Sequence, residues 1–105
     1  MGYEIEIDKE INSCGINYSV FIEANITYSC SEDPEPTDVE ITHCDIADED
    51  GNPVTWDLEE GRIEKIKVFC PDLERAIDSA LWSEIQTHTE DNYRYIQWDL
   101  EDDSE

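Results

Sequence analysis

The sequence is short of positive charge. Its 105 residues hold six Lys and Arg against 29 Asp and Glu, which gives a formal net charge of -23 at pH 7. A nucleic-acid-binding protein needs a basic patch to neutralise phosphates, so this composition argues against direct binding to nucleic acid. An anionic membrane surface would repel the chain for the same reason. A length of 105 residues predicts a single domain with a core of modest size.

Long apolar runs are also missing. No stretch approaches the ~18 apolar residues that a membrane-spanning helix needs, and residues 1–6 lack the basic start of a signal peptide. We therefore expect a cytoplasmic protein that has no contact with a membrane. In that compartment cysteines are expected to be reduced thiols. The four cysteines are Cys14, Cys30, Cys44 and Cys70.

Catalytic and metal-binding motifs are absent too. The chain has two histidines and no nucleophile elbow, P-loop or zinc-protease motif, so we predict that it is not an enzyme. No two cysteines lie within about four positions of each other, as zinc ligands usually do. The segment from Asp48 to Gly51 resembles part of a calcium loop, but a hairpin turn explains the same residues. We expect no cofactor and no metal ion.

What the sequence does contain is a strong two-residue alternation in its first half. Residues 3–8 alternate apolar or aromatic side chains with acidic ones, and the even positions from Ile16 to Cys30 are apolar or aromatic. This period predicts two half-buried strands that pair antiparallel. The Pro-containing acidic segment 31–36 is expected to be a loop.

A third strand is expected to follow this loop, from about Asp38 to Ile46. The apolar parity changes within it, which predicts a β-bulge near His43. After an acidic turn at residues 48–53, residues 54–58 are predicted to form a short fourth strand that completes a hairpin.

The second half of the chain changes to a helical period. Leu73, Ile77, Leu81 and Ile85 recur at steps of four after a proline-containing start, which predicts an amphipathic helix that ends near His88.

Three further segments are less regular. Residues 62–69 fit either a helix or a strand, residues 93–100 are expected to form a last edge strand or a docked tail, and residues 101–105 a frayed acidic tail. The expected fold is α+β. An antiparallel sheet of three to five strands is followed by one or two C-terminal helices packed on one face, in a single domain over residues 1–100.

The acidic residues gather in the half of the chain that is predicted to form the sheet. Residues 1–61 hold seventeen Asp and Glu and one Lys, whereas four of the six basic residues fall within residues 62–75. A net charge of about 2–8 keeps a small domain soluble, so the excess indicates a surface with a function, such as docking into a basic groove. The alternative explanations of the excess charge are solubility alone and adaptation to a salt-rich cytoplasm. The residues expected to form this partner-binding face are Glu4, Glu6, Asp8, Glu23, Glu40, Asp48 and Asp50.

Aromatic residues near the C-terminus offer a second kind of contact. Most aromatic side chains in a small domain belong to the core, but an exposed aromatic beside acidic residues is typical of an interface anchor. The candidate anchors are Trp98 and Tyr95.

In size, charge and sheet-plus-helix layout, the whole chain resembles the small acidic accessory proteins of bacteriophages and mobile elements. It is similar to the DNA-mimic inhibitors among them, which include anti-restriction and anti-CRISPR proteins. The resemblance rests on no sequence motif and assigns no residue. It implies an inhibitor in the host cytoplasm that presents carboxylates where a basic nucleic-acid-binding protein expects phosphates.

Two other functions remain open. A phage structural or assembly accessory protein would make its contacts, including contacts with a second copy, through an apolar sheet edge or the C-terminal aromatics. A metal-binding module is the third hypothesis.

Overall fold

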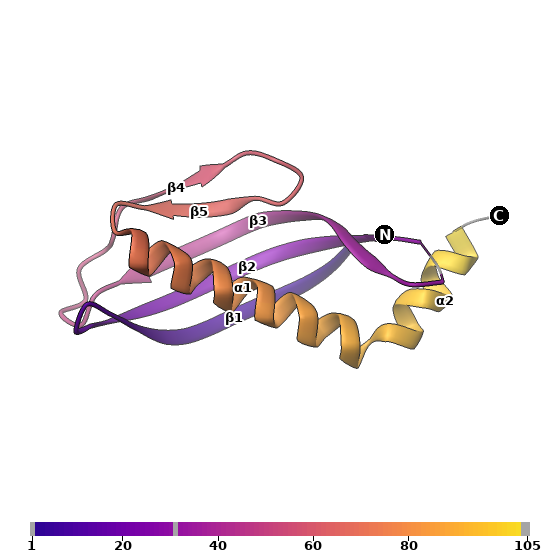
Figure 1. Cartoon of the computed structure of the whole chain (residues 1–105), viewed down its shortest axis with the longest axis horizontal. Coiled ribbons are helices and arrows are strands. Elements are labelled where there is room, and N and C mark those ends of the chain that lie inside the picture. Colours follow the sequence, from indigo (N-terminus) through magenta and orange to yellow (C-terminus); the bar gives the residue numbers. More distant parts are fainter. Residues whose placement is uncertain (1, 31, 104–105) are drawn as a thin grey trace.

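The computed structural model describes residues 2–30 and 32–103. It confirms the predicted α+β class, with a three-stranded sheet, a separate two-stranded sheet and two C-terminal helices (Figure 1). In chain order the elements are β1 (Gly2–Ser13), β2 (Ile16–Ser29), β3 (Glu35–Ala47), β4 (Trp56–Glu59), β5 (Lys65–Val68), α1 (Pro71–Asp91) and α2 (Tyr93–Asp103). No helix in these two ranges is both long enough and apolar enough to cross a bilayer.

The larger sheet has the strand order β1-β2-β3, and both strand pairs are antiparallel. β1 and β2 are joined by the two-residue turn Cys14–Gly15, whose φ angles are 53° and 80°. Two positive φ angles are what a tight turn between twisted antiparallel strands requires. The predicted pairing of the first two strands is confirmed, and β1 extends to Ser13, beyond residues 3–8, whose alternation predicted the strand.

The predicted β-bulge in β3 is present. His43 lies opposite Glu23 and Ile41 lies opposite Ala24, so Thr42 is an extra residue on the β3 side. Because one added residue reverses which face the side chains take, the buried positions of β3 change from odd to even numbers after the bulge.

The predicted pairing of the fourth strand is wrong. β4 does not complete a hairpin with β3; it pairs antiparallel with β5. The chain does turn back after β3, where the Val54 N–H donates to the Ile46 carbonyl over 2.8 Å, but this contact does not continue as a ladder into β4. Residues 62–69 fitted either a helix or a strand from their sequence. Part of this segment forms β5, so that part is extended and not helical.

The outer edge of β3 is covered by the segment that connects β4 to β5. The Val39 N–H donates to the Arg62 carbonyl over 3.0 Å, and the Glu64 N–H donates to the Val39 carbonyl over 3.1 Å. The Glu64 carboxylate accepts a further hydrogen bond from the Ile41 N–H over 2.9 Å. These bonds satisfy backbone groups that an edge strand would otherwise expose.

α1 lies along one face of the larger sheet and buries the predicted stripe (Figure 1). The helix starts with Pro71 in its first turn, as predicted, and ends at Asp91, slightly past the predicted end near His88. The stripe residues that it packs against the sheet are Leu73, Ile77, Leu81 and Ile85.

Of the two alternatives for residues 93–100, the edge strand is wrong, because these residues belong to α2, which docks on the core. Ile96 is fully buried and Leu100, one helical turn later, is partly buried against the core. The spacing of four between Ile96 and Leu100 is typical of a helix. It was missed because the aromatic residues before and between these two positions favour a strand. α2 continues through Asp103, so the first residues of the predicted acidic tail are helical, and residues 104–105 lie outside the described part of the chain.

A cluster of rings attaches the end of α1 to the sheet. The Tyr28 hydroxyl lies 3.0 Å from His88 Nδ1 and 2.9 Å from Thr89 Oγ1, and the ring of Tyr3 contacts His88 at 5.5 Å. Partial burial lowers the pKa of His88 below its usual value of 6.5, although Glu84 and other nearby acidic groups oppose the shift.

We expect this histidine to make stability depend on pH. Since the pKa of His88 is lower in the folded chain, the unfolded chain takes up a proton more readily. The contribution is therefore present above pH ~6.5 and is lost as the pH falls through the folded pKa. The urea midpoint should be lower at pH ~5.5 than at pH ~7.5, and His88→Gln should reduce that difference. Equal pH dependence in both proteins would contradict the assignment.

Candidate functional site: the open face of the sheet

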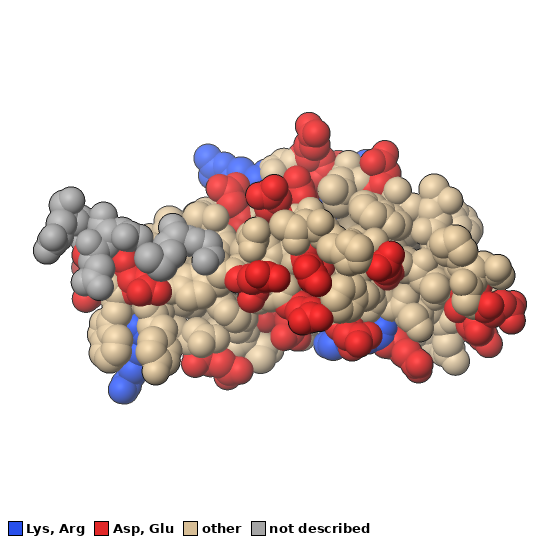
Figure 2. All heavy atoms as spheres, turned by 180° about the vertical axis from the view of Figure 1, so that it is seen from behind, with Lys and Arg blue, Asp and Glu red and all other residues tan. Residues whose placement is uncertain are grey.

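The face of the three-stranded sheet that lies opposite α1 carries no helix, and we call it the open face. Its strands present side chains that alternate with the buried ones, and many of them are acidic. Figure 2 shows carboxylates spread along this side of the molecule among uncharged side chains, with Lys and Arg side chains along its edges. The acidic residues of the open face are Glu4, Glu6, Asp8, Glu10, Glu23, Asp38, Glu40 and Asp45.

Cross-strand pairing arranges these residues in rows. Glu6 lies directly opposite Glu23. In the next row, Asp8 and Asp45 lie on either side of Phe21. Neighbouring strands are ~4.8 Å apart, and alternate residues along one strand are ~6.8 Å apart. The open face is therefore a grid of carboxylates at regular spacing, held by the hydrogen bonds of a rigid sheet.

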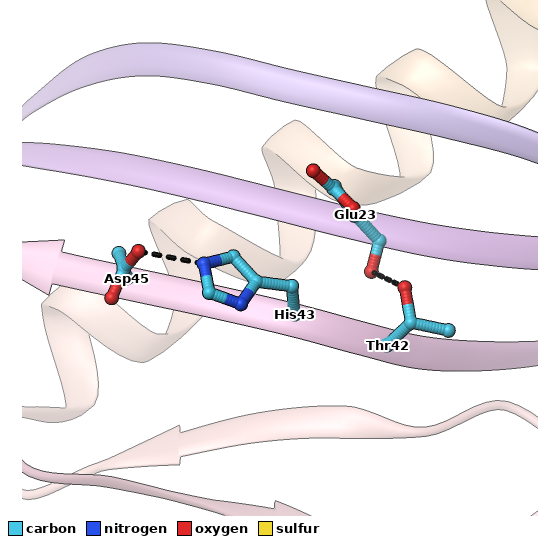
Figure 3. Close-up of polar contacts among 4 residues, drawn as sticks. All are labelled: Glu23, Thr42, His43 and Asp45. Carbon is cyan, nitrogen blue, oxygen red and sulfur yellow. Dashed lines mark hydrogen bonds and ion pairs between the residues drawn. The ribbon is translucent and has the colours of Figure 1, made fainter.

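The β-bulge shapes the centre of the open face. His43 Nε2 lies 2.7 Å from Asp45 Oδ2, and the His43 ring contacts Phe21 edge-to-face at 5.7 Å. The Thr42 hydroxyl donates a hydrogen bond to the Glu23 carbonyl over 3.2 Å, which connects the bulge to β2. Figure 3 shows His43 and Asp45 on β3, with Glu23 on the neighbouring strand.

Positive charge lies at the border of the open face and elsewhere on the molecule. Arg62 lines a pocket with Asp38 and Glu40 at the β3 edge of this face. Of the side chains described on the open face, none belongs to Lys or Arg. Lys67 pairs with Glu59 at 3.5 Å across β4 and β5. Lys9 belongs to β1, but it lies at an odd position and therefore takes the side of Ile5 and Ile7. The outward side chains of the three strands thus carry a single sign of charge, and Arg62 lies at their edge.

Like charges that face each other across two strands cost stability. We expect Glu23→Gln to raise the free energy of unfolding by about 0.2–1 kcal/mol, because it removes the repulsion with Glu6. The gain, measured by urea denaturation, should shrink at high salt. Glu10→Gln is the matched control, since Glu10 lies opposite Ser19. If Glu23→Gln and Glu10→Gln raise the free energy of unfolding equally at low salt, the repulsion does not come from the pair of Glu6 and Glu23.

The structure brings together five of the seven predicted face residues, which are Glu4, Glu6, Asp8, Glu23 and Glu40. The other two, Asp48 and Asp50, lie in the turn that follows β3. The Asp48 carboxylate accepts hydrogen bonds from the N–H groups of Asp50 and Asn52 at 3.0 and 2.9 Å. Asp48 therefore stabilises its own turn, as the hairpin interpretation predicted, and is not a free surface charge.

The prediction missed three members of the open face. Glu10 was overlooked because the alternation that predicted β1 covers only residues 3–8. Asp45 lies beyond the bulge, where the odd positions face outward, so its place follows from the predicted change of parity. Asp38 stands opposite Thr27 near the start of β3, on the same parity as Glu40.

The two predicted aromatic anchors lie on α2, outside the three-stranded sheet. Tyr95 is 66% exposed and Trp98 is 59% exposed, and their rings meet edge-to-face at 6.1 Å. A second aromatic feature is a groove of about 600 Å³ between α1 and the loop before β3, whose lining includes Trp82, Tyr93 and Pro34.

The four cysteines are free thiols. Cys44 is buried, and this burial raises the pKa of its thiol to about 12. Within the residues that the structure describes, no group of three or more His, Cys, Asp and Glu side chains is arranged to hold a metal ion.

Comparisons with known proteins found no match. No family model, no curated protein and no solved structure matches this chain.

Proposed function

We propose that this chain is a non-enzymatic acidic interaction protein of the DNA-mimic type. Its open face binds the basic nucleic-acid-binding groove of another protein and inhibits that protein by occupying the groove. The single observation that carries the proposal is a rigid sheet face with eight carboxylates and, among its described side chains, no Lys or Arg.

The density of charge supports the same proposal. A net charge of -23 over a longest dimension of 51 Å corresponds to about one charge per 2 Å of length. Duplex DNA carries one charge per ~1.7 Å of its axis. A groove that attracts DNA by neutralising phosphates would attract this protein for the same electrostatic reason.

The fold supports the proposal as well. A carboxylate on a flexible loop must lose conformational freedom on binding, whereas side chains on a sheet are already held by their backbone. The bulge and its Thr42 hydrogen bond fix the register at the centre of the face. Such an arrangement presents charge at fixed spacing with a small entropic cost.

The first test is capture of partners from a host lysate at about 0.1 M and about 0.5 M salt, a change that shortens the Debye length about twofold. We expect one nucleic-acid-binding protein to be retained at low salt, released at high salt and displaced by added DNA or RNA. Capture that persists at high salt and ignores added nucleic acid would contradict the proposal.

One observation favours a second candidate, an assembly accessory protein. Tyr95 and Trp98 form an exposed aromatic pair on α2, and Phe69, just before α1, is 80% exposed. Apolar contacts of this kind do not weaken as salt increases. Salt-insensitive binding that is lost in a Tyr95→Ser, Trp98→Ser variant would favour this function over the mimic.

A further inference from the structure

Two cysteines that are far apart in the sequence meet at the N-terminal end of α1. Cys14 lies in the exposed turn between β1 and β2, and Cys70 is the N-cap residue of α1. The Cys14 thiol donates a hydrogen bond to Asp72 Oδ2 over 3.6 Å, and the Ser13 hydroxyl lies 4.0 Å from Cys70 Sγ. Because Ser13 and Cys14 are consecutive and each contacts a residue at the start of α1, the two cysteines lie beside each other.

The surroundings of Cys70 are those of a nucleophilic thiol. Cys70 makes no side-chain capping hydrogen bond, yet the nearby backbone N–H of Leu73 lowers the pKa of its thiol. Partial burial opposes this shift, whereas Ser13, the Asp72 N–H and Cys14 add to it. Cys70 is also only partly buried, so a small reagent can reach it.

Cys14 has the opposite character. Its hydrogen bond to Asp72, together with the negative charges close by, raises the pKa of its thiol. It is exposed and adjacent to Cys70, but it holds its proton more firmly. This difference in pKa suits thiol–disulfide exchange in which Cys70 is the attacking thiol and Cys14 is the resolving thiol.

We propose that Cys70 and Cys14 form a thiol modification site, in which Cys70 reacts with a low-molecular-weight disulfide and Cys14 then closes an intramolecular disulfide. In the first step, the Cys70 thiolate attacks one sulfur of the small disulfide, forms a mixed disulfide and expels the other half as a thiolate. In the second step, Cys14 loses its proton to solvent, and its sulfur attacks the Cys70 sulfur and expels the second half as a thiolate. Two protein thiols are oxidised, and one small disulfide is reduced to two thiols.

The Asp72 contact affects the second step. Since Asp72 disfavours the Cys14 thiolate, it slows the second step, in which the mixed disulfide on Cys70 converts to the internal bond. The closed bond ties the β1–β2 turn to the start of α1. Because the bond closes a loop of roughly 60 residues, it should raise the melting temperature by about 10 °C.

The other two cysteines provide internal controls. Cys30 is exposed and has a positive φ of 71°, as Cys14 does, but it follows the opposite end of β2. Cys44 is buried and has a raised pKa. We expect Cys30 to react at the rate of an ordinary exposed thiol and Cys44 to react much more slowly than either.

The experiment exposes the reduced whole chain to oxidised glutathione at pH ~7.5, stops the reaction at intervals by alkylation, and locates the products by peptide mass spectrometry. We expect glutathione on Cys70 at least about fivefold faster than on Cys30, followed by a Cys14–Cys70 disulfide. Cys14→Ser should leave the adduct on Cys70 without closure, Cys30→Ser should change neither step, and Asp72→Asn should speed closure.

Equal rates at Cys70 and Cys30 in the unaltered chain would overturn the proposal. So would a mixed disulfide on Cys70 that never converts to the internal bond. Both outcomes are read within one molecule, so neither depends on whether a variant folds. The chemistry is also independent of the open face, so this result and the partner-binding result can fail separately.

Discussion

Reversing the charge of Glu4 and Glu6 together, as Glu4→Lys and Glu6→Lys, is expected to slow association with a basic partner severalfold. Both residues lie on the open face, on the strand at one edge of the sheet. Electrostatic steering acts mainly on the association rate, and each reversal replaces an attraction by a repulsion. Stopped-flow or surface-binding kinetics at ~0.1 M salt measures the effect, which should diminish as the salt concentration increases.

The control changes the net charge equally but away from the open face. Glu90 and Asp91 both belong to the end of α1, and both are exposed. If charge alone sets the rate, Glu90→Lys with Asp91→Lys will slow association as much as the open-face pair. If the open face is the docking surface, the control will slow it distinctly less. An unchanged rate in the Glu4 and Glu6 variant would contradict the proposed interface.

Ile77→Ala is expected to have the largest effect on stability, a loss of about 2–5 kcal/mol in the free energy of unfolding. Ile77 is 1% exposed and lies in the middle of the stripe that α1 packs against the sheet. Its truncation removes apolar contacts and leaves a cavity that a stiff sheet cannot fill. Domains of this size have only about 5–15 kcal/mol of stability, so the variant should be partly unfolded at moderate urea concentrations.

The matched control for this substitution is Gln86→Ala on the same helix. Gln86 is exposed, so its replacement should change the free energy of unfolding by no more than about 0.5 kcal/mol. Urea denaturation followed by circular dichroism measures both variants. If Ile77→Ala costs no more than Gln86→Ala, α1 does not pack on the sheet as described.

The parts of the fold that could be predicted from the sequence are those with a sustained period. β2 alternates over its whole length, and α1 repeats its apolar residues at steps of four, so both elements and their buried faces were predicted. The bulge near His43 followed from a change of parity, because a single extra residue is the simplest way to reverse the face.

The errors arose where pairing or spacing is set by tertiary contacts. β4 is short, and nothing in its sequence distinguishes β3 from β5 as its partner; the choice depends on how residues 62–64 cover the edge of β3. The start of α2 is rich in aromatic residues, which favour strands, and the two buried positions of its helix were too few to reveal the helical period.

The sequence predicted most of the carboxylates at the centre of the open face, but not where this face begins and ends. Five of the expected carboxylates share the face because alternation along a strand fixes which side each residue takes. The sequence placed Asp48 in a turn, but the hydrogen bonds that its carboxylate accepts from N–H groups depend on the conformation of that turn. The proximity of Cys14 and Cys70 depends wholly on how α1 begins beside the β1–β2 turn.

The most direct test of the central claim is displacement of nucleic acid from the captured partner. Labelled duplex DNA is bound to the partner, and its fluorescence anisotropy is followed as this protein is added. We predict full displacement by the unaltered chain, and a requirement for at least about tenfold more of the Glu4→Lys, Glu6→Lys variant. A stable ternary complex with the DNA still bound, or equal displacement by the variant and the unaltered chain, would contradict mimicry by the open face.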